Sequence, residues 1–155
     1  MAYRITGVDP APFMHLYGLS DAALKEHKAL RRIATGPSGF PERTQMRDAV
    51  VGEPLLLVNF QHQPANSPYQ SSHAIFILEG AETTVSVHNQ VPEYLSKRLI
   101  SLRAFDGDDL IAAADIASGH DLTVLIERYL AMPNVRYLHA HFARYGCFAA
   151  RVERA

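Results

Sequence analysis

The chain has 155 residues, of which 48% are hydrophobic and 20% are charged, and its formal net charge is −1 from 15 basic and 16 acidic side chains. This size and composition are typical of a soluble globular protein, so we expect residues 1–155 to form one domain. A groove that follows phosphates needs a basic surplus, which is missing, so the charge balance argues against a nucleic-acid partner. The adjacent basic residues Arg31-Arg32 and Lys97-Arg98 are interpreted as solvated surface.

The chain has neither the ~20 consecutive apolar residues of a membrane span nor the apolar core of a signal peptide, so we expect no membrane partner. Cys147 is the only cysteine, which fits a reducing compartment and predicts a cytoplasmic location. Eight histidines are many for a chain of this length. They are the compositional feature that points towards chemistry.

The first part of the chain consists of short predicted elements separated by turn signals. Residues 3–8 alternate like a short strand, and Ser20 is placed to cap a short helix through residue 27. Residues 36–41 contain two glycines and two prolines, which indicates a loop. The continuous apolar run PLLLVNFQ, residues 54–61, predicts a central strand that is buried on both faces.

A polar connection, HQPANSPYQSS, follows this strand and leads into a second strand over residues 73–78. The connection has eleven residues, which is longer than most loops inside a domain, and such loops often carry function. His62 and His73 lie at its two ends, so adjacent pairing of the two strands would bring both imidazoles to one end of the sheet. Tyr69, Ser71 and Ser72 would add hydroxyl groups there. A solvated loop is the simpler alternative.

The second part predicts a helix, a hairpin, a longer helix and a final hairpin. Residues 92–99 are typical of a short helix with proline in its first turn, and residues 100–105 and 110–116 pair across an Asp-Gly-Asp-Asp turn. A helix capped by Asp121 carries apolar residues at i, i+3, i+4, i+7 and i+8 spacing. Residues 135–152 form the last hairpin. The total is about seven to nine strands with three or four short helices, which predicts an α+β fold with a mostly antiparallel sheet.

The C-terminal hairpin carries the most informative motif, YLHAHFARYGC. Strand residues alternate between the two faces of a sheet, so His139 and His141 point to the same face. A three-residue loop ending at Gly146 would place Cys147 on that face, near His141, and would set His139 opposite Arg151. A two-residue loop would place Cys147 in the core instead, because a shift of one residue reverses every side chain of the partner strand. We prefer the three-residue loop.

These positions supply two sets of candidate site residues. The candidate catalytic residues are His139, His141 and Cys147, which could work as a thiolate paired with histidine. The candidate binding residues are His62, Tyr69, Ser72, His73 and Arg103. A guanidinium in mid-strand, such as that of Arg103, suits a carboxylate or phosphate, although it is equally often an outward residue.

A zinc site would need four protein ligands, or three with a water molecule, and the histidines with Cys147 could supply that number. A lone cysteine is more often a small buried hydrophobe, so we predict no metal and assign no cofactor. Three functions stay open. The protein is an enzyme or ligand-processing protein with a histidine-rich cleft, a non-catalytic module that binds a small anion or a peptide there, or a structural protein that acts through a homodimer face.

Several stretches of the chain stand out together, namely RITGVDPAPF, GLSDAAL, LLLVNFQHQPANSPYQSSHAIFILEGA, VPEYLSKRLISLRAFD and YLHAHFARYGCFAARVERA. Their combination resembles a bacterial family catalogued as domain of unknown function 1203. The resemblance extends over nearly the whole chain and implies no substrate, because the family has no established activity. Many members have an asparagine after the second histidine and a cysteine after the Gly-aromatic-Pro stretch, where this chain has Phe142 and Glu42. A metal site built on two cysteines is therefore not general.

Overall fold

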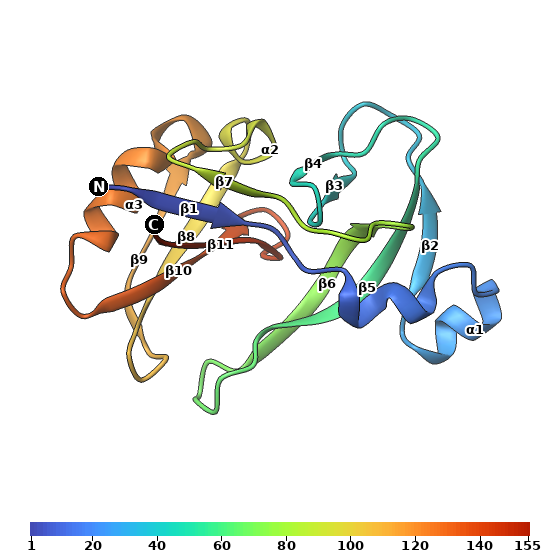
Figure 1. Cartoon of the computed structure of the whole chain (residues 1–155), viewed down its shortest axis with the longest axis horizontal. Helices are drawn as coiled ribbons and strands as arrows, with labels where there is room; N and C mark the ends of the chain where they lie inside the picture. The colour runs from blue at the N-terminus through green and yellow to red at the C-terminus, as the bar shows by residue number, and fades with distance from the viewer.

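The computed structural model describes residues 1–155, which fold around two β-sheets lying side by side (Figure 1). The strand order is β7-β1-β11-β10-β8-β9 in the six-stranded sheet and β2-β5-β6-β3-β4 in the five-stranded sheet. All strand pairs are antiparallel except β3–β6. The predicted α+β class, the mostly antiparallel pairing and the C-terminal hairpin are confirmed.

The six-stranded sheet consists of β1 (Tyr3–Thr6), β7 (Ser86–His88), β8 (Leu99–Asp106), β9 (Ile111–Ser118), β10 (Val135–Phe142) and β11 (Phe148–Arg154). The five-stranded sheet consists of β2 (Leu30–Ile33), β3 (Pro41–Glu42), β4 (Arg47–Asp48), β5 (Pro54–Gln63) and β6 (Ser71–Leu78). The helices are η1 (Ala11–Leu16), α1 (Asp21–Glu26), α2 (Glu93–Ser96), η2 (Gly119–Asp121) and α3 (Leu122–Leu130).

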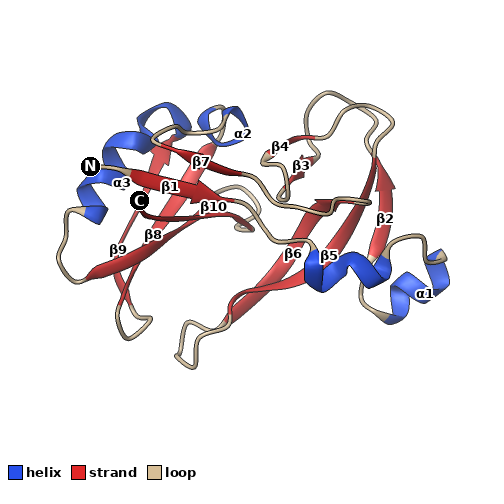
Figure 2. Cartoon of the chain, viewed as in Figure 1, coloured by secondary structure: helices blue, strands red, loops and turns tan.

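Helix α3 packs against the six-stranded sheet, while α1 lies beside β2 at the other end of the molecule (Figure 2). The apolar positions of α3 that the spacing singled out are all buried, namely Leu122, Leu125, Ile126, Tyr129 and Leu130. They join the core formed by β8 and β10. Full burial of one such side chain stabilises a fold by about 1.5–3 kcal/mol, so this stripe determines which face of the helix meets the sheet.

Four strands that the sequence did not predict, β2, β3, β4 and β7, have only two to four residues each, too few for a periodic pattern. The strands expected in one sheet are divided between two. Strand β5 extends to Gln63 and β6 begins at Ser71, so the polar connection is shorter than predicted. Helix α2 is also shorter, because β8 already begins at Leu99. Ser20 accepts the expected capping hydrogen bond, from the Ala23 amide, whereas the Asp121 side chain makes none.

The two sheets share one aromatic side chain, Phe148 of β11. Although β11 belongs to the six-stranded sheet, the Phe148 ring lies in the apolar core that covers β5 and β6. The ring stacks on His62 of β5, with centroids 5.6 Å apart, and meets the edge of Phe60 at 5.7 Å. Phe148 is therefore the main apolar connection between the sheets.

We expect Phe148→Ala to lower the free energy of unfolding by about 3–5 kcal/mol, because it removes a fully packed ring and leaves a cavity between the sheets. Urea denaturation followed by circular dichroism measures this change. Tyr145→Ala is the matched control in the same hairpin, since the Tyr145 side chain is 84% exposed. Equal losses in the two variants would show that Phe148 does not hold the sheets together.

Candidate functional site

Three of the predicted histidines form one buried cluster between the sheets. His62 comes from β5, and His139 and His141 come from β10. The ring centroid of His62 lies 4.9 Å from that of His141 and 6.2 Å from that of His139, and the two β10 rings are 6.2 Å apart. All three side chains are buried. The strand period correctly placed His139 and His141 on one face, and His139 lies opposite Arg151, as the register of the preferred loop predicted.

Two irregularities in strand pairing build this cluster. The β5–β6 pairing shifts register between Phe60 and Gln63, and His62 lies inside the shift. The β10–β11 pairing shifts between Ala140 and His141, so that His141 faces Phe148. Bulges of this kind turn individual side chains away from the regular alternation and are common beside functional sites.

Hydrogen bonds determine which ring nitrogens carry the protons. The Ser71 hydroxyl donates to the carbonyl of Tyr69 (3.0 Å), so it accepts from Nε2 of His62 (3.0 Å). Nδ1 of His141 donates to the carbonyl of Gly146 (2.9 Å). The other nitrogen of each ring is then a bare acceptor. Nδ1 of His62, Nε2 of His141 and Nδ1 of His139 are all buried without a hydrogen-bond partner.

The electrostatic surroundings of the cluster disfavour any added positive charge. Burial, reinforced by the nearby Arg103 guanidinium, lowers the pKa from the ordinary 6.5 to about 4 for His62, about 2 for His139 and about 3 for His141. Arg151 adds to the effect at His139. The three imidazoles are therefore neutral at pH 7. No group of three or more His, Cys, Asp or Glu side chains is arranged to hold a metal ion.

The remaining predicted binding residues lie around the cluster or outside it. Arg103 of β8 pairs with His139 across the strands, and its Nε lies 3.4 Å from the Ser101 hydroxyl. Tyr69 is largely exposed, with its ring edge towards Phe105 at 6.3 Å between centroids. Ser72 is exposed. His73 is half-buried and belongs to a different feature, a cleft described below.

The prediction that Cys147 lies on the histidine face is wrong. Two backbone hydrogen bonds close the turn between Phe142 and Cys147: the Phe142 amide donates to the Cys147 carbonyl, and the Gly146 amide donates to the Phe142 carbonyl. The loop between them therefore has one residue more than the preferred version, and Cys147 lies in the core with Phe142. The bulge then brings Phe148 to the histidine face, where Cys147 was expected.

A cleft of about 1100 Å³ lies on the Cys147 side, between β6 and the β10–β11 turn. Four cationic side chains line it, Arg43, Lys97, Arg98 and Arg144, and no Asp or Glu does. Its apolar surface comes from both sheets and includes Leu57, Ile75, Phe76, Leu99 and Phe142. The Lys97-Arg98 pair, interpreted from the sequence as solvated surface, thus forms part of a cavity wall.

Arg43 is the most buried of the four cations, with 2% of its surface exposed. Its Nε donates to the Phe148 carbonyl (2.9 Å), Nη2 donates to Sγ of Cys147 (2.9 Å), and Nη1 donates to the Pro41 carbonyl. No carboxylate pairs with it. Burial lowers the pKa of this guanidinium, and Tyr94 and Cys147 oppose the shift.

Lys97 and Arg98 share one carboxylate, that of Asp48 in β4. Nη2 of Arg98 lies 2.5 Å from Oδ1 of Asp48, and the Lys97 ammonium contacts Oδ2. Burial alone would raise the pKa of Asp48, but the hydrogen bonds from Arg98 and Lys97 hold it below its ordinary value. This contact connects the two sheets beside the cleft.

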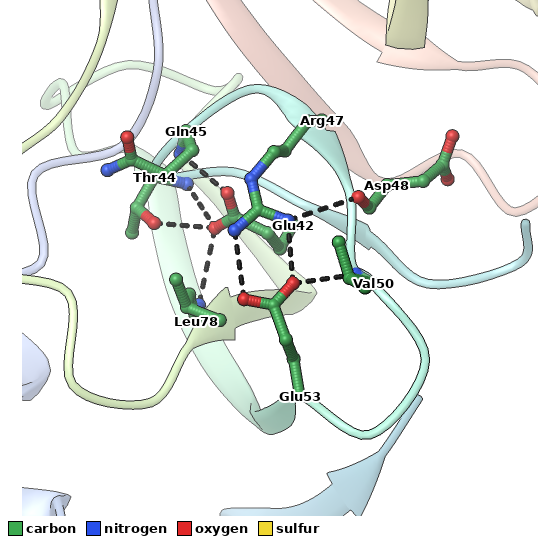
Figure 3. A network of polar contacts seen from close by, with 8 residues as sticks. All are labelled: Glu42, Thr44, Gln45, Arg47, Asp48, Val50, Glu53 and Leu78. Atoms are coloured by element: carbon green, nitrogen blue, oxygen red, sulfur yellow. Dashed lines mark hydrogen bonds and ion pairs between the residues drawn. The ribbon is translucent and has the colours of Figure 1, made fainter. Parts of the chain in front are cut away.

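The segment that supplies Arg43 and Asp48 is held by a carboxylate network (Figure 3). Glu42 is fully buried and accepts hydrogen bonds from the amides of Thr44 (2.9 Å), Gln45 (2.6 Å) and Leu78 (3.2 Å), and from the Thr44 hydroxyl (2.5 Å). Beside it, Glu53 forms two bonds of 2.7 and 3.0 Å with the Arg47 guanidinium and accepts from the Val50 amide. Each buried acceptor is satisfied, so the network fixes the backbone around Arg43.

The fold and the two polar features define an α+β protein with a buried histidine cluster and a cationic cleft at the junction of its sheets. Residues 39–154 match the family model described as protein of unknown function (DUF1203), and the chain belongs to this family. No curated protein and no solved structure matches the chain. None of its helices has the length and apolar character needed to span a membrane.

Lowering the pH from 7 to 5 should destabilise the protein. The unfolded chain binds protons at the three cluster histidines near the ordinary pKa of 6.5, whereas the folded chain binds them only below about 4. Stability is therefore complete above pH 6.5 and falls as the pH drops, by about 2 kcal/mol for each histidine between pH 7 and 5. Urea denaturation at several pH values measures the slope.

The variant His139→Gln should reduce this pH dependence by the share of one histidine, whatever its effect on stability at pH 7. His120→Gln, at an exposed position outside the cluster, is the matched control. A wild-type stability that is equal at pH 5 and pH 7 would contradict the neutral, buried cluster.

Proposed function

We propose that this protein binds a small anionic molecule in the cleft between its two sheets. The observation that carries the proposal is the composition of the cleft wall, in which four cationic side chains and no carboxylate face one cavity. The whole chain has a net charge of −1, so this concentration of positive charge is local. A cavity lined by one sign of charge attracts ligands of the opposite sign and favours their binding.

Arg144 supports the proposal most directly. It lies in the exposed β10–β11 turn at the rim of the cleft, and no hydrogen bond or ion pair within the chain engages it. Arg43 and Arg98 lie deeper, with their Cζ atoms 5.0 and 5.2 Å from the centroid of the Phe142 ring. An anion that contacts Arg144 would thus also sit in the positive field of two fixed guanidinium groups.

A catalytic role remains the alternative, and it rests on two predicted residues that line the same cleft, Cys147 and His73. In this reading the protein would process its ligand rather than only hold it. His139 and His141 lie on the opposite face of β10, so a reaction in the cleft would not use them directly. Their proposed contribution is to hold β5 against β10.

The affinity of the cleft should depend on Arg144. The fluorescent organic anion 8-anilinonaphthalene-1-sulfonate is a suitable probe, titrated into the protein at low ionic strength. Arg144→Gln should weaken its binding about two- to fivefold, the effect of removing one exposed charge pair. Arg136→Gln removes an exposed cation of β10 that does not line the cleft, and should leave the affinity unchanged. Equal effects of the two variants would contradict the proposed site.

The variant Cys147→Ser separates binding from catalysis. A serine hydroxyl can still accept the hydrogen bond from Arg43, so we expect the probe to bind as it does to the wild type. Retained binding agrees with a module that only holds its ligand. Lost binding, with an unchanged circular dichroism spectrum, would assign the thiol a direct part in the ligand site and favour the catalytic alternative.

A further inference from the structure

We infer that the cleft selects an organic monoanion with an apolar body, such as a medium-chain alkyl carboxylate, over inorganic phosphate or a polyphosphate. This inference rests on the proposed function and specifies its ligand class. It follows from two independent properties of the wall, the number of cations that are free to meet a ligand and the amount of apolar surface left open beside them.

The cations of the cleft are not equally available. Arg43 uses Nε, Nη1 and Nη2 on two carbonyl groups and the Cys147 sulfur. Lys97 and Arg98 already share the carboxylate of Asp48. Arg144 alone has no partner in the chain. The cleft can therefore receive one anionic group at Arg144 without breaking any existing hydrogen bond or ion pair, whereas a polyphosphate would compete with Asp48 for Lys97 and Arg98.

The apolar part of the wall points to the rest of the ligand. Leu99 is 49% exposed although it borders the cleft, and Leu57 and Phe76, which pair across β5 and β6, are only half-buried there. Tyr145, at the rim beside Arg144, is 84% exposed. Covering such surface with an apolar ligand is favourable, and a cavity of about 1100 Å³ has room for a chain of several carbons.

Isothermal titration calorimetry with a series of straight-chain carboxylates, from acetate to decanoate, tests the inference. The affinity should rise about two- to fourfold for each added CH₂ group while the chain extends along the apolar wall. Inorganic phosphate and tripolyphosphate, measured under the same conditions, should bind more weakly than decanoate.

Two variants separate the contributions of charge and apolar surface. Arg144→Gln should weaken the binding of every carboxylate by a similar factor and leave the gain in affinity for each CH₂ group unchanged. Leu99→Ser should reduce that gain, because it removes an apolar side chain that the folded protein already exposes. Ile116→Ser is the matched control, since Ile116 is 59% exposed on β9 and does not line the cleft.

The outcomes distinguish this inference from the proposed function. If tripolyphosphate binds at least as tightly as decanoate, with an affinity that Arg144→Gln reduces, the anion site stands and the monoanion inference falls. An affinity that does not increase with chain length, or a gain that Leu99→Ser does not reduce, overturns the inference in the same way. If no anion binds, or if Arg144→Gln has no effect on any of them, the proposed function falls as well.

Discussion

The insertion of Arg43 between the two sheets is the contact on which the arrangement of the molecule depends. Arg43 follows β3 in the five-stranded sheet, yet it donates to the Phe148 carbonyl and the Cys147 sulfur of the six-stranded sheet. A buried charge without a carboxylate partner is costly, and it persists only where its hydrogen bonds are satisfied and its backbone is held in place. The network of Glu42 and Glu53 provides that support. The sheets therefore meet at a fixed separation, which leaves the histidine cluster closed on one side and the cleft open on the other.

These two features have opposite chemistry although they share strand β10. The histidine face is tightly packed and its imidazoles are neutral. The guanidinium groups nearby disfavour any added positive charge on this face. The opposite face opens onto the cleft, where fixed guanidinium groups lie beside partly exposed apolar side chains. A side chain's role in this hairpin therefore depends on the face to which it points, and a single bulge between Ala140 and His141 exchanges the faces of Cys147 and Phe148.

This bulge also marks how far the sequence could predict the site. The period of a strand was enough to place His139 and His141 on one face, whereas the pairing of His139 with Arg151 came from the assumed length of the turn. His62 joins these two histidines because the two sheets pack together. In the sequence, only the length of the polar connection after His62 pointed to this region. The bulge has no signal in the local pattern, so the position of Cys147 could not be predicted. The cleft was missed for another reason, because Arg43, Arg98 and Arg144 come from three separate segments and each looks like an ordinary surface cation in the sequence.

Strand β1 lies outside the region that the family model matches, although it belongs to the same sheet. The matched region begins at residue 39, but β1 lies inside the six-stranded sheet, where β7 and β11 pair with its two sides. A fragment limited to residues 39–154 would lose the pairing partner of β7 and expose the backbone of β11 as a sheet edge. Open edges of this kind recruit strands from other molecules, so such a fragment should aggregate or exchange strands between copies. The N-terminal residues are thus part of the architecture of the matched region rather than an appendage to it.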